Sequence, residues 1–127
     1  MKVNGANIFF GGDLHDLPSS HPLADRVNLR IARQIGEEIS LYKAPHHGTN
    51  GTGLKETLAI YRPQNTVITN GLKYLPPQSE IFVNIRAARP DARVYLTENQ
   101  NVVFSVGQDG SVRLTEGPEP YDLTQGA

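Results

Sequence analysis

Short β-favouring runs alternate along the chain with apolar stripes of helical period, and this alternation constrains the fold more than any other feature. The β runs cover residues 6–12, 39–45 and 66–69. Apolar residues at a spacing of about one helical turn fill residues 23–35 and 54–61 between those runs. A chain built in this order buries its apolar faces by layering helices on a sheet, so the pattern predicts an α/β domain.

The C-terminal part continues the alternation and then changes character. A third helix is expected over residues 77–88, because Pro77 suits a first helical turn and Pro90 follows the last apolar position. Short β runs then follow at 93–97, 101–106 and 111–114, separated by turn sequences. We therefore expect a mixed sheet, three helices and a C-terminal antiparallel meander.

Length, charge and cysteine content limit the classes of protein that fit. The 127 residues suffice for one domain, which we place at 1–116, with a flexible tail at 117–127. The net charge of -1 argues against a general polyanion binder, so any nucleic acid must be held by a local site. The lack of cysteine excludes thiolate zinc sites. No run approaches the roughly eighteen apolar residues of a membrane span, and we expect a cytoplasmic chain without membrane contact.

Residues that can hold a metal follow two of the expected strands. Gly12-Asp13 closes the first apolar run, and His46-His47-Gly48 closes the second. Ligands gather at the carboxyl ends of strands in open α/β sheets, so an aspartate and a histidine delivered there could share one ion. The sequence therefore predicts part of a metal site.

Each of these residues also has an ordinary structural interpretation. Asp13 could form an Asx-turn or cap a helix, and His46 and His47 could be exposed loop residues. If the segment is extended, the two imidazoles point to opposite sides, and only one of them can readily face a given metal. The Thr49 hydroxyl could bond a substrate oxygen or an imidazole.

Several neighbours are weaker candidates for the same site. His15 and His21 could complete the metal site if the loop after Asp13 folds back toward it, and otherwise they are solvated loop residues. Lys43 could reach a phosphate or simply face solvent. Asn70 and Tyr74 follow the third strand and could lie beside the site, with a plain turn as the alternative.

Four segments in order resemble a known family. Residues 8–14, 41–49, 67–71 and 94–97 read Ile-Phe-Phe-Gly-Gly-Asp-Leu, Leu-Tyr-Lys-Ala-Pro-His-His-Gly-Thr, Val-Ile-Thr-Asn-Gly and Val-Tyr-Leu-Thr. They resemble the second half of a metallo-β-lactamase superfamily domain, and in particular the hydrolase domain of DNA-uptake competence proteins. The resemblance covers about residues 6–115 and implies half of an αββα sandwich.

The resemblance also implies roles for individual residues. In that family two metal ions, zinc or manganese, are bridged by the aspartate and completed by a histidine of the Pro-His-His-Gly motif. Carried across, Asp13 and His46 become metal ligands, His47 and Thr49 catalytic residues, and Lys43 and Asn70 substrate-binding residues.

Two departures from the family pattern leave two hypotheses for function. The family's His-x-His-x-Asp-His motif is absent from this chain, and Tyr74-Leu75-Pro76-Pro77 stands where Tyr-Gly-His-Pro is usual. The first hypothesis is a metal-dependent hydrolase of phosphodiesters, nucleic acid among them, that needs a missing N-terminal half and is inactive alone. The second is a non-catalytic binding or assembly module, which covers its open sheet face with a second copy and forms a homo-oligomer.

Overall fold

The computed structural model describes residues 1–14, 16, 26–49 and 52–126, and within them the chain forms two sheets. A five-stranded sheet has the order β1-β2-β3-β4-β5, and β6 and β7 pair separately. Strands β2 to β5 run parallel to one another, and only β1 of this sheet is antiparallel. The strands are β1 Lys2–Val3, β2 Ala6–Phe10, β3 Leu41–Lys43, β4 Asn65–Ile68, β5 Arg93–Leu96, β6 Val103–Val106 and β7 Val112–Glu116.

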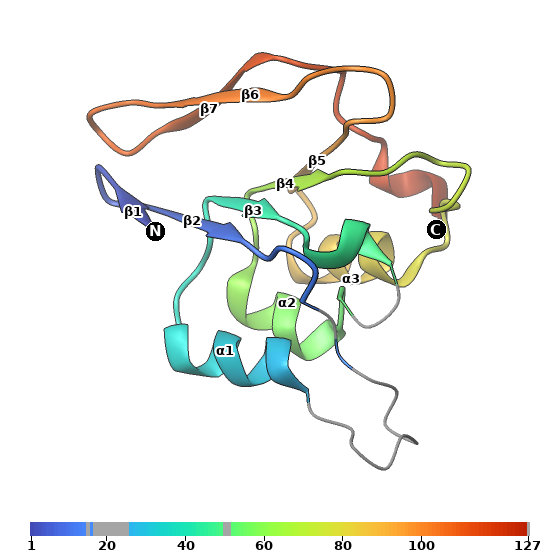
Figure 1. Cartoon of the computed structure of the whole chain (residues 1–127), viewed down its shortest axis with the longest axis horizontal. Helices are drawn as coiled ribbons and strands as arrows, with labels where there is room; N and C mark the ends of the chain where they lie inside the picture. The colour runs from blue at the N-terminus through green and yellow to red at the C-terminus, as the bar shows by residue number, and fades with distance from the viewer. Residues whose placement is uncertain (15, 17–25, 50–51, 127) are drawn as a thin grey trace.

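The helices of the described residues cover one face of the large sheet. They are α1 Val27–Ile35, α2 Lys55–Tyr61 and α3 Glu80–Ala88, with short 3-10 turns η1 Pro45–Gly48 and η2 Leu123–Gly126. Each α-helix joins two adjacent parallel strands, and right-handed crossovers that all advance in one direction place their helices on the same side. Figure 1 shows the three helices below the sheet and the β6–β7 hairpin above it.

The expected fold class is confirmed: the chain is α/β, with a mixed sheet, three helices and a C-terminal antiparallel pair of strands. One detail of the expected meander differs. Its first strand is β5, which pairs in parallel with β4 and so belongs to the large sheet. The neighbour of β5 is set by the α3 crossover, a long-range constraint that the local turn signals do not contain.

The antiparallel strand β1 comes from a turn signal at the start of the chain that the sequence analysis did not use. Asn4 and Gly5 both have positive φ, 51° and 86°, and join β1 to β2. Two consecutive residues of positive φ are typical of the type I′ turn, for which Asn-Gly is a favoured sequence. The pair therefore closes a hairpin at the edge of the sheet.

The core lies between the sheet and its helices. Tyr42 is central, since its ring centroid lies 5.5 Å from that of Phe9 and 5.6 Å from that of Tyr61. The large aromatic and aliphatic side chains that are essentially fully buried are Tyr42, Tyr61, Phe82, Leu58, Ile68, Ile81, Ile85 and Val94. They come from the sheet, α2 and α3, so burial of this face is what holds the strands and helices in one layered unit.

The opposite face of the sheet is only partly covered. Phe10, Lys43, Val67 and Tyr95 are register partners across four strands and therefore share this face. Tyr95 is 2% exposed, with its ring 5.5 Å from that of Phe104 in the hairpin, whereas Phe10 at the other end of the row is 67% exposed. The hairpin thus covers the β5 side of this face and leaves the β2 side open.

The segment after β7, for which the sequence predicts a flexible tail, packs against the domain in the structure. The Tyr121 ring stacks on Phe82 of α3 with centroids 4.5 Å apart, and the Tyr121 amide donates to the Val94 carbonyl at 2.7 Å. Leu123 in η2 is 9% exposed. Tyr121 and Leu123 therefore bury apolar surface against the domain, and the backbone bond holds the segment in place. The sequence did not indicate this packing because the segment has no apolar periodicity.

None of the helices in the described part of the chain is long and apolar enough to cross a membrane.

Candidate functional site

The parallel strands bring the candidate ligands to one edge of the sheet. Phe10 at the end of β2 is the register partner of Lys43 at the end of β3, so the two strands finish level with each other. Asp13 follows the end of β2 by three residues, and His47 lies in η1, shortly after the end of β3. These ends lie toward the right of Figure 1.

Asp13 and His47 face each other at this edge. The Nε2 atom of His47 lies 3.9 Å from Oδ1 of Asp13, and the two side chains are 57% and 84% exposed. That separation is too long for a direct hydrogen bond. Two ligand atoms held at about 2.1 Å by one tetrahedral ion lie about 3.4 Å apart, so this pair would have to approach by about 0.5 Å to share an ion.

The second ring nitrogen of His47 is held by Thr69. Nδ1 lies 2.9 Å from the Thr69 hydroxyl oxygen and 3.2 Å from the Thr69 carbonyl oxygen. A carbonyl only accepts hydrogen bonds, so the carbonyl contact is a hydrogen bond only when Nδ1 carries the ring hydrogen. In that neutral tautomer the Nε2 lone pair is available to a metal.

The backbone of the two histidines is not extended, so that part of the sequence-based expectation is wrong. His46 and His47 have φ of 45° and 57°, and Gly48 follows with φ of 72°. The His46 amide donates to the Gly12 carbonyl at 2.7 Å, and Asn70 Nδ2 donates to the His47 carbonyl at 3.0 Å. These long-range bonds stabilise a left-handed turn, a conformation that costs each residue with a Cβ atom about 1–2 kcal/mol.

His46 contacts Thr49 through one of its ring nitrogens. Its Nδ1 lies 2.8 Å from the Thr49 hydroxyl, which also contacts the His46 carbonyl at 2.7 Å. The family resemblance makes His46 the ligand and His47 its neighbour. The geometry gives the position opposite Asp13 to His47.

The two predicted substrate-binding residues both make internal bonds. Lys43 Nζ donates to the Ala44 carbonyl at 2.7 Å. Burial lowers the pKa of Lys43, while the negative charge of Asp13 acts in the opposite direction. Asn70, besides holding His47, accepts a hydrogen bond from the Gly71 amide through Oδ1 at 2.9 Å. The bond to Ala44 uses one of the three hydrogens of the Lys43 ammonium group, and Asn70 positions the histidine turn.

Glycines allow the site to be tightly packed. A Cβ atom added at Gly11 would lie 2.5 Å from Cβ of Pro45, and one added at Gly48 would lie 2.9 Å from Cγ2 of Ile68. The end of β2 therefore touches η1, and η1 touches the end of β4. Any larger residue at either glycine must move the backbone that carries the candidate ligands.

Asp16 anchors the loop that carries Asp13, a role that the sequence analysis did not anticipate. It is 4% exposed, and its Oδ1 accepts a hydrogen bond from the Asn28 amide in the first turn of α1 at 2.9 Å. A carboxylate eleven residues before the first residue of the helix thus caps it, where a cap is expected from an adjacent residue. His15 and His21, the other histidines of this loop, lie outside the described residues.

The fit of these residues to a metal is partial. Across the described ranges, no group of three or more His, Asp or Glu side chains is gathered closely enough to hold an ion. A zinc or manganese centre needs at least three protein ligands to be tightly bound. Asp13 and His47 therefore supply two positions of a shell that requires more.

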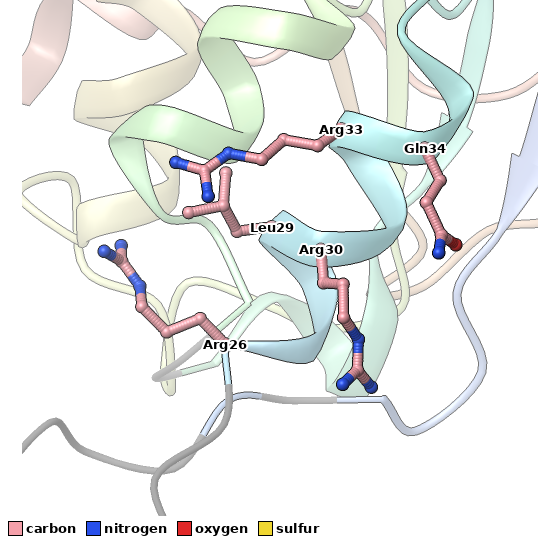
Figure 2. A pocket seen from close by; sticks show the side chains of 5 residues that line it. All are labelled: Arg26, Leu29, Arg30, Arg33 and Gln34. Atoms are coloured by element: carbon pink, nitrogen blue, oxygen red, sulfur yellow. The ribbon is translucent and has the colours of Figure 1, made fainter.

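A separate hollow of about 520 Å³ lies on α1 (Figure 2). Its lining consists of Arg26, Leu29, Arg30, Arg33 and Gln34. Arg26 is engaged in an ion pair with Glu56 of α2 at 2.9 Å. Among the residues that the structure describes, this lining includes no carboxylate or imidazole.

No model of a known protein family matches the chain, and no curated protein matches it. Function is therefore inferred from the geometry and chemistry of the strand-end site.

Substitution of Gly48 by alanine is expected to destabilise the protein more than substitution of Gly12. Both glycines have positive φ, 72° and 57°, so both variants bear backbone strain of about 1–2 kcal/mol. Only the Gly48→Ala side chain meets another atom, the buried Ile68, which adds about 1–3 kcal/mol. Urea denaturation measures the difference, and equal free energies of unfolding for the two variants would contradict the packing described for η1.

Proposed function

We propose that the chain is part of a metal-dependent hydrolase of the metallo-β-lactamase superfamily that cleaves phosphodiester or similar ester bonds. Asp13 and His47 are the metal ligands that this chain contributes. The observation that carries the proposal is their 3.9 Å approach at the strand ends. Such a pair can share one ion after an approach of about 0.5 Å, whereas the separation does not suit a direct hydrogen bond.

The arrangement of the family-like motifs supports the proposal. The Gly-Asp and Pro-His-His-Gly segments follow neighbouring parallel strands, and the His46 amide joins them by its bond to Gly12. Thr69 fixes the His47 ring as second partners of metal-bound histidines do. Both features put rigid donors at an edge where α/β sheets commonly bind ligands.

Each residue then has a specific part in the chemistry. When bound, the metal ions would generate hydroxide near neutral pH and stabilise negative charge on the transferred group. Asp13 and His47 would hold such an ion, and Thr69 would fix the orientation of the His47 ring. Lys43 lies within the electrostatic influence of Asp13 and can exchange its Ala44 contact for a phosphate oxygen. The remaining ligands come from a second polypeptide segment that carries the histidine-rich motif.

Metal affinity should depend on His47 more than on His46. Titration of the chain with Mn²⁺, followed by paramagnetic broadening in NMR spectra, is expected to affect Asp13 and His47 first. Thr69→Val should weaken binding about tenfold to a hundredfold, because it releases the His47 ring. His47→Ala should weaken it at least as much, with His46→Ala as the matched control of smaller effect. A larger loss in His46→Ala would reassign the ligand.

The chain by itself is expected to hydrolyse phosphodiesters poorly, because two ligands do not hold a catalytic ion tightly. The measurement is turnover of a nitrophenyl phosphodiester with added Zn²⁺ or Mn²⁺, alone and after mixing with a polypeptide that carries the histidine-rich motif. Addition of that polypeptide should raise the rate, and the gain should be lost in Asp13→Asn. Robust metal-dependent turnover by the chain alone would refute the division of ligands.

The open sheet face favours a second candidate function, a non-catalytic assembly module. The hairpin leaves Phe10 67% exposed on this face. A contiguous apolar patch left open on a surface marks an association site. The net charge of -1 offers little repulsion between copies, so a homodimer that packs these faces together is the natural way to bury them.

The assembly candidate predicts a dimer in solution. Light scattering at micromolar concentration should give the mass of two chains, and Phe10→Glu should shift it toward one by placing a charge in the interface. Val83→Glu is the matched control, since Val83 is 46% exposed but lies on α3, on the helical side. A clean monomer for the unmodified chain would exclude self-association.

A further inference from the structure

We infer that the exposed side of α1 binds an acidic peptide segment, whose carboxylates pair with the arginine side chains of this helix. The inference goes beyond the proposed hydrolase and does not depend on it. The surface is the hollow of about 520 Å³ that is lined by Arg26, Leu29, Arg30, Arg33 and Gln34 (Figure 2). The candidate metal ligands are not part of this lining.

Charge is unevenly distributed along the chain, and α1 with its N-cap residue carries only one sign. Residues 26–35 contain three of the twelve basic residues and none of the thirteen acidic ones. The rest of the chain therefore has nine basic residues against thirteen acidic ones. A chain with a net charge of -1 thus presents a local positive surface, and charges within a Debye length of about 10 Å decide which ligand it attracts.

The spacing of the three arginines is unfavourable for the helix itself. Arg26 and Arg30 are four residues apart and Arg30 and Arg33 are three apart, so both pairs bring like charges together. The first turn of α1 contains no acidic residue, although a helix N-terminus favours negative charge. A bound segment that carries carboxylates would relieve both effects, because it supplies the opposite charge.

The ion pair of Arg26 shows how a carboxylate binds beside this surface. Glu56 of α2 meets the Arg26 guanidinium with both oxygens, at 2.9 Å from Nη2 and 3.5 Å from Nη1. The hydrogen bond from Arg26 lowers the pKa of Glu56, because the guanidinium stabilises the ionised carboxylate. The two side chains are 44% and 53% exposed, so an incoming carboxylate can compete with Glu56 for Arg26.

Arg33 is the position at which an external carboxylate gains most. The residue is exposed, and its side chain forms no hydrogen bond or ion pair with any residue that the structure describes. Its guanidinium presents five N–H donors in a planar fork that matches the two oxygens of a carboxylate. The first carboxylate of the ligand therefore binds at Arg33.

Several anionic groups spaced along a chain fit this surface better than a single phosphate does. Figure 2 shows Arg26 and Arg33 extending on one side of α1, with Leu29 between them, while Arg30 extends on the other side. Guanidinium groups that diverge in this way do not close on one small anion. Arg26 and Arg33 are about 10.5 Å apart along the helix axis. Acidic residues three positions apart in a polyproline II segment lie on one face and span about 9.3 Å, which is close to that distance.

A short acidic peptide also fits better than a long polyanion such as a nucleic acid. The nine residues of α1 span about 13.5 Å, so a longer polyanion would extend onto the rest of the molecule, where acidic residues outnumber basic ones. Among the described residues, the lining offers no aromatic ring on which a base could stack. The ligand is thus a segment of about four to six residues that is rich in glutamate or aspartate.

NMR titration of the ¹⁵N-labelled chain with the peptide hexaglutamate, at low salt and without metal, tests the inference. The largest shifts are expected at residues 26–34, including the side-chain Nε signal of Arg33. Arg33→Gln should weaken binding about twofold to fivefold, as expected for the loss of one exposed ion pair, and Arg33→Glu should weaken it about tenfold. Arg93→Gln is the matched control, because Arg93 is an exposed arginine of β5 outside the lining. Unchanged affinity of Arg33→Glu, or shifts centred elsewhere, would overturn the assignment.

Glu56→Gln gives a prediction of the opposite sign. Removal of the internal carboxylate leaves Arg26 to the peptide, so binding should tighten about twofold to fivefold, and weaker binding would contradict the competition. Hexaglutamine should not bind, and about 500 mM NaCl should abolish the shifts caused by hexaglutamate. Binding of a single-stranded oligonucleotide of equal charge at residues 26–34, as tight as that of hexaglutamate, would refute the choice of a peptide.

Discussion

The hydrogen bond from the His46 amide to the Gly12 carbonyl, 2.7 Å long, is the contact on which the strand-end site depends. It joins the segment after β2 to the segment after β3 at the point where both leave the sheet. Parallel pairing makes the two strands end level, but it does not by itself bring the following loops together. Because this bond does so, Asp13 and His47 come to face each other across 3.9 Å.

The left-handed turn at His46 and His47 is the strained element that this bond helps to hold. Two residues with positive φ cost free energy, and the backbone contacts from Gly12 and Asn70 offset that cost. The turn is packed from below, since Gly48 lies against Ile68 of the core. A site held in this way has its imidazole fixed before any ligand arrives, which is the condition for effective metal binding and for catalysis.

The one-sided sheet connects the two candidate functions. Right-handed crossovers in a single direction put α1, α2 and α3 on one face, and the β6–β7 hairpin covers only part of the other. The exposed Phe10 immediately precedes the Gly11-Gly12-Asp13 segment. A polypeptide layer packed on the open face would therefore end beside the candidate metal ligands. One partner could thus both cover the apolar face and supply the additional metal ligands.

The sequence by itself determined the alternation of strands and helices and the placement of Asp13 and the two histidines after neighbouring strands. Local propensity and period suffice for that, because each element carries its own pattern. Only the tertiary structure decided that His47 faces Asp13, that β5 joins the large sheet, and that Tyr121 and Leu123 dock on the domain. Those outcomes depend on bonds and contacts between residues far apart in the chain, such as Gly12 with His46 and Asn70 with His47, which no local pattern encodes.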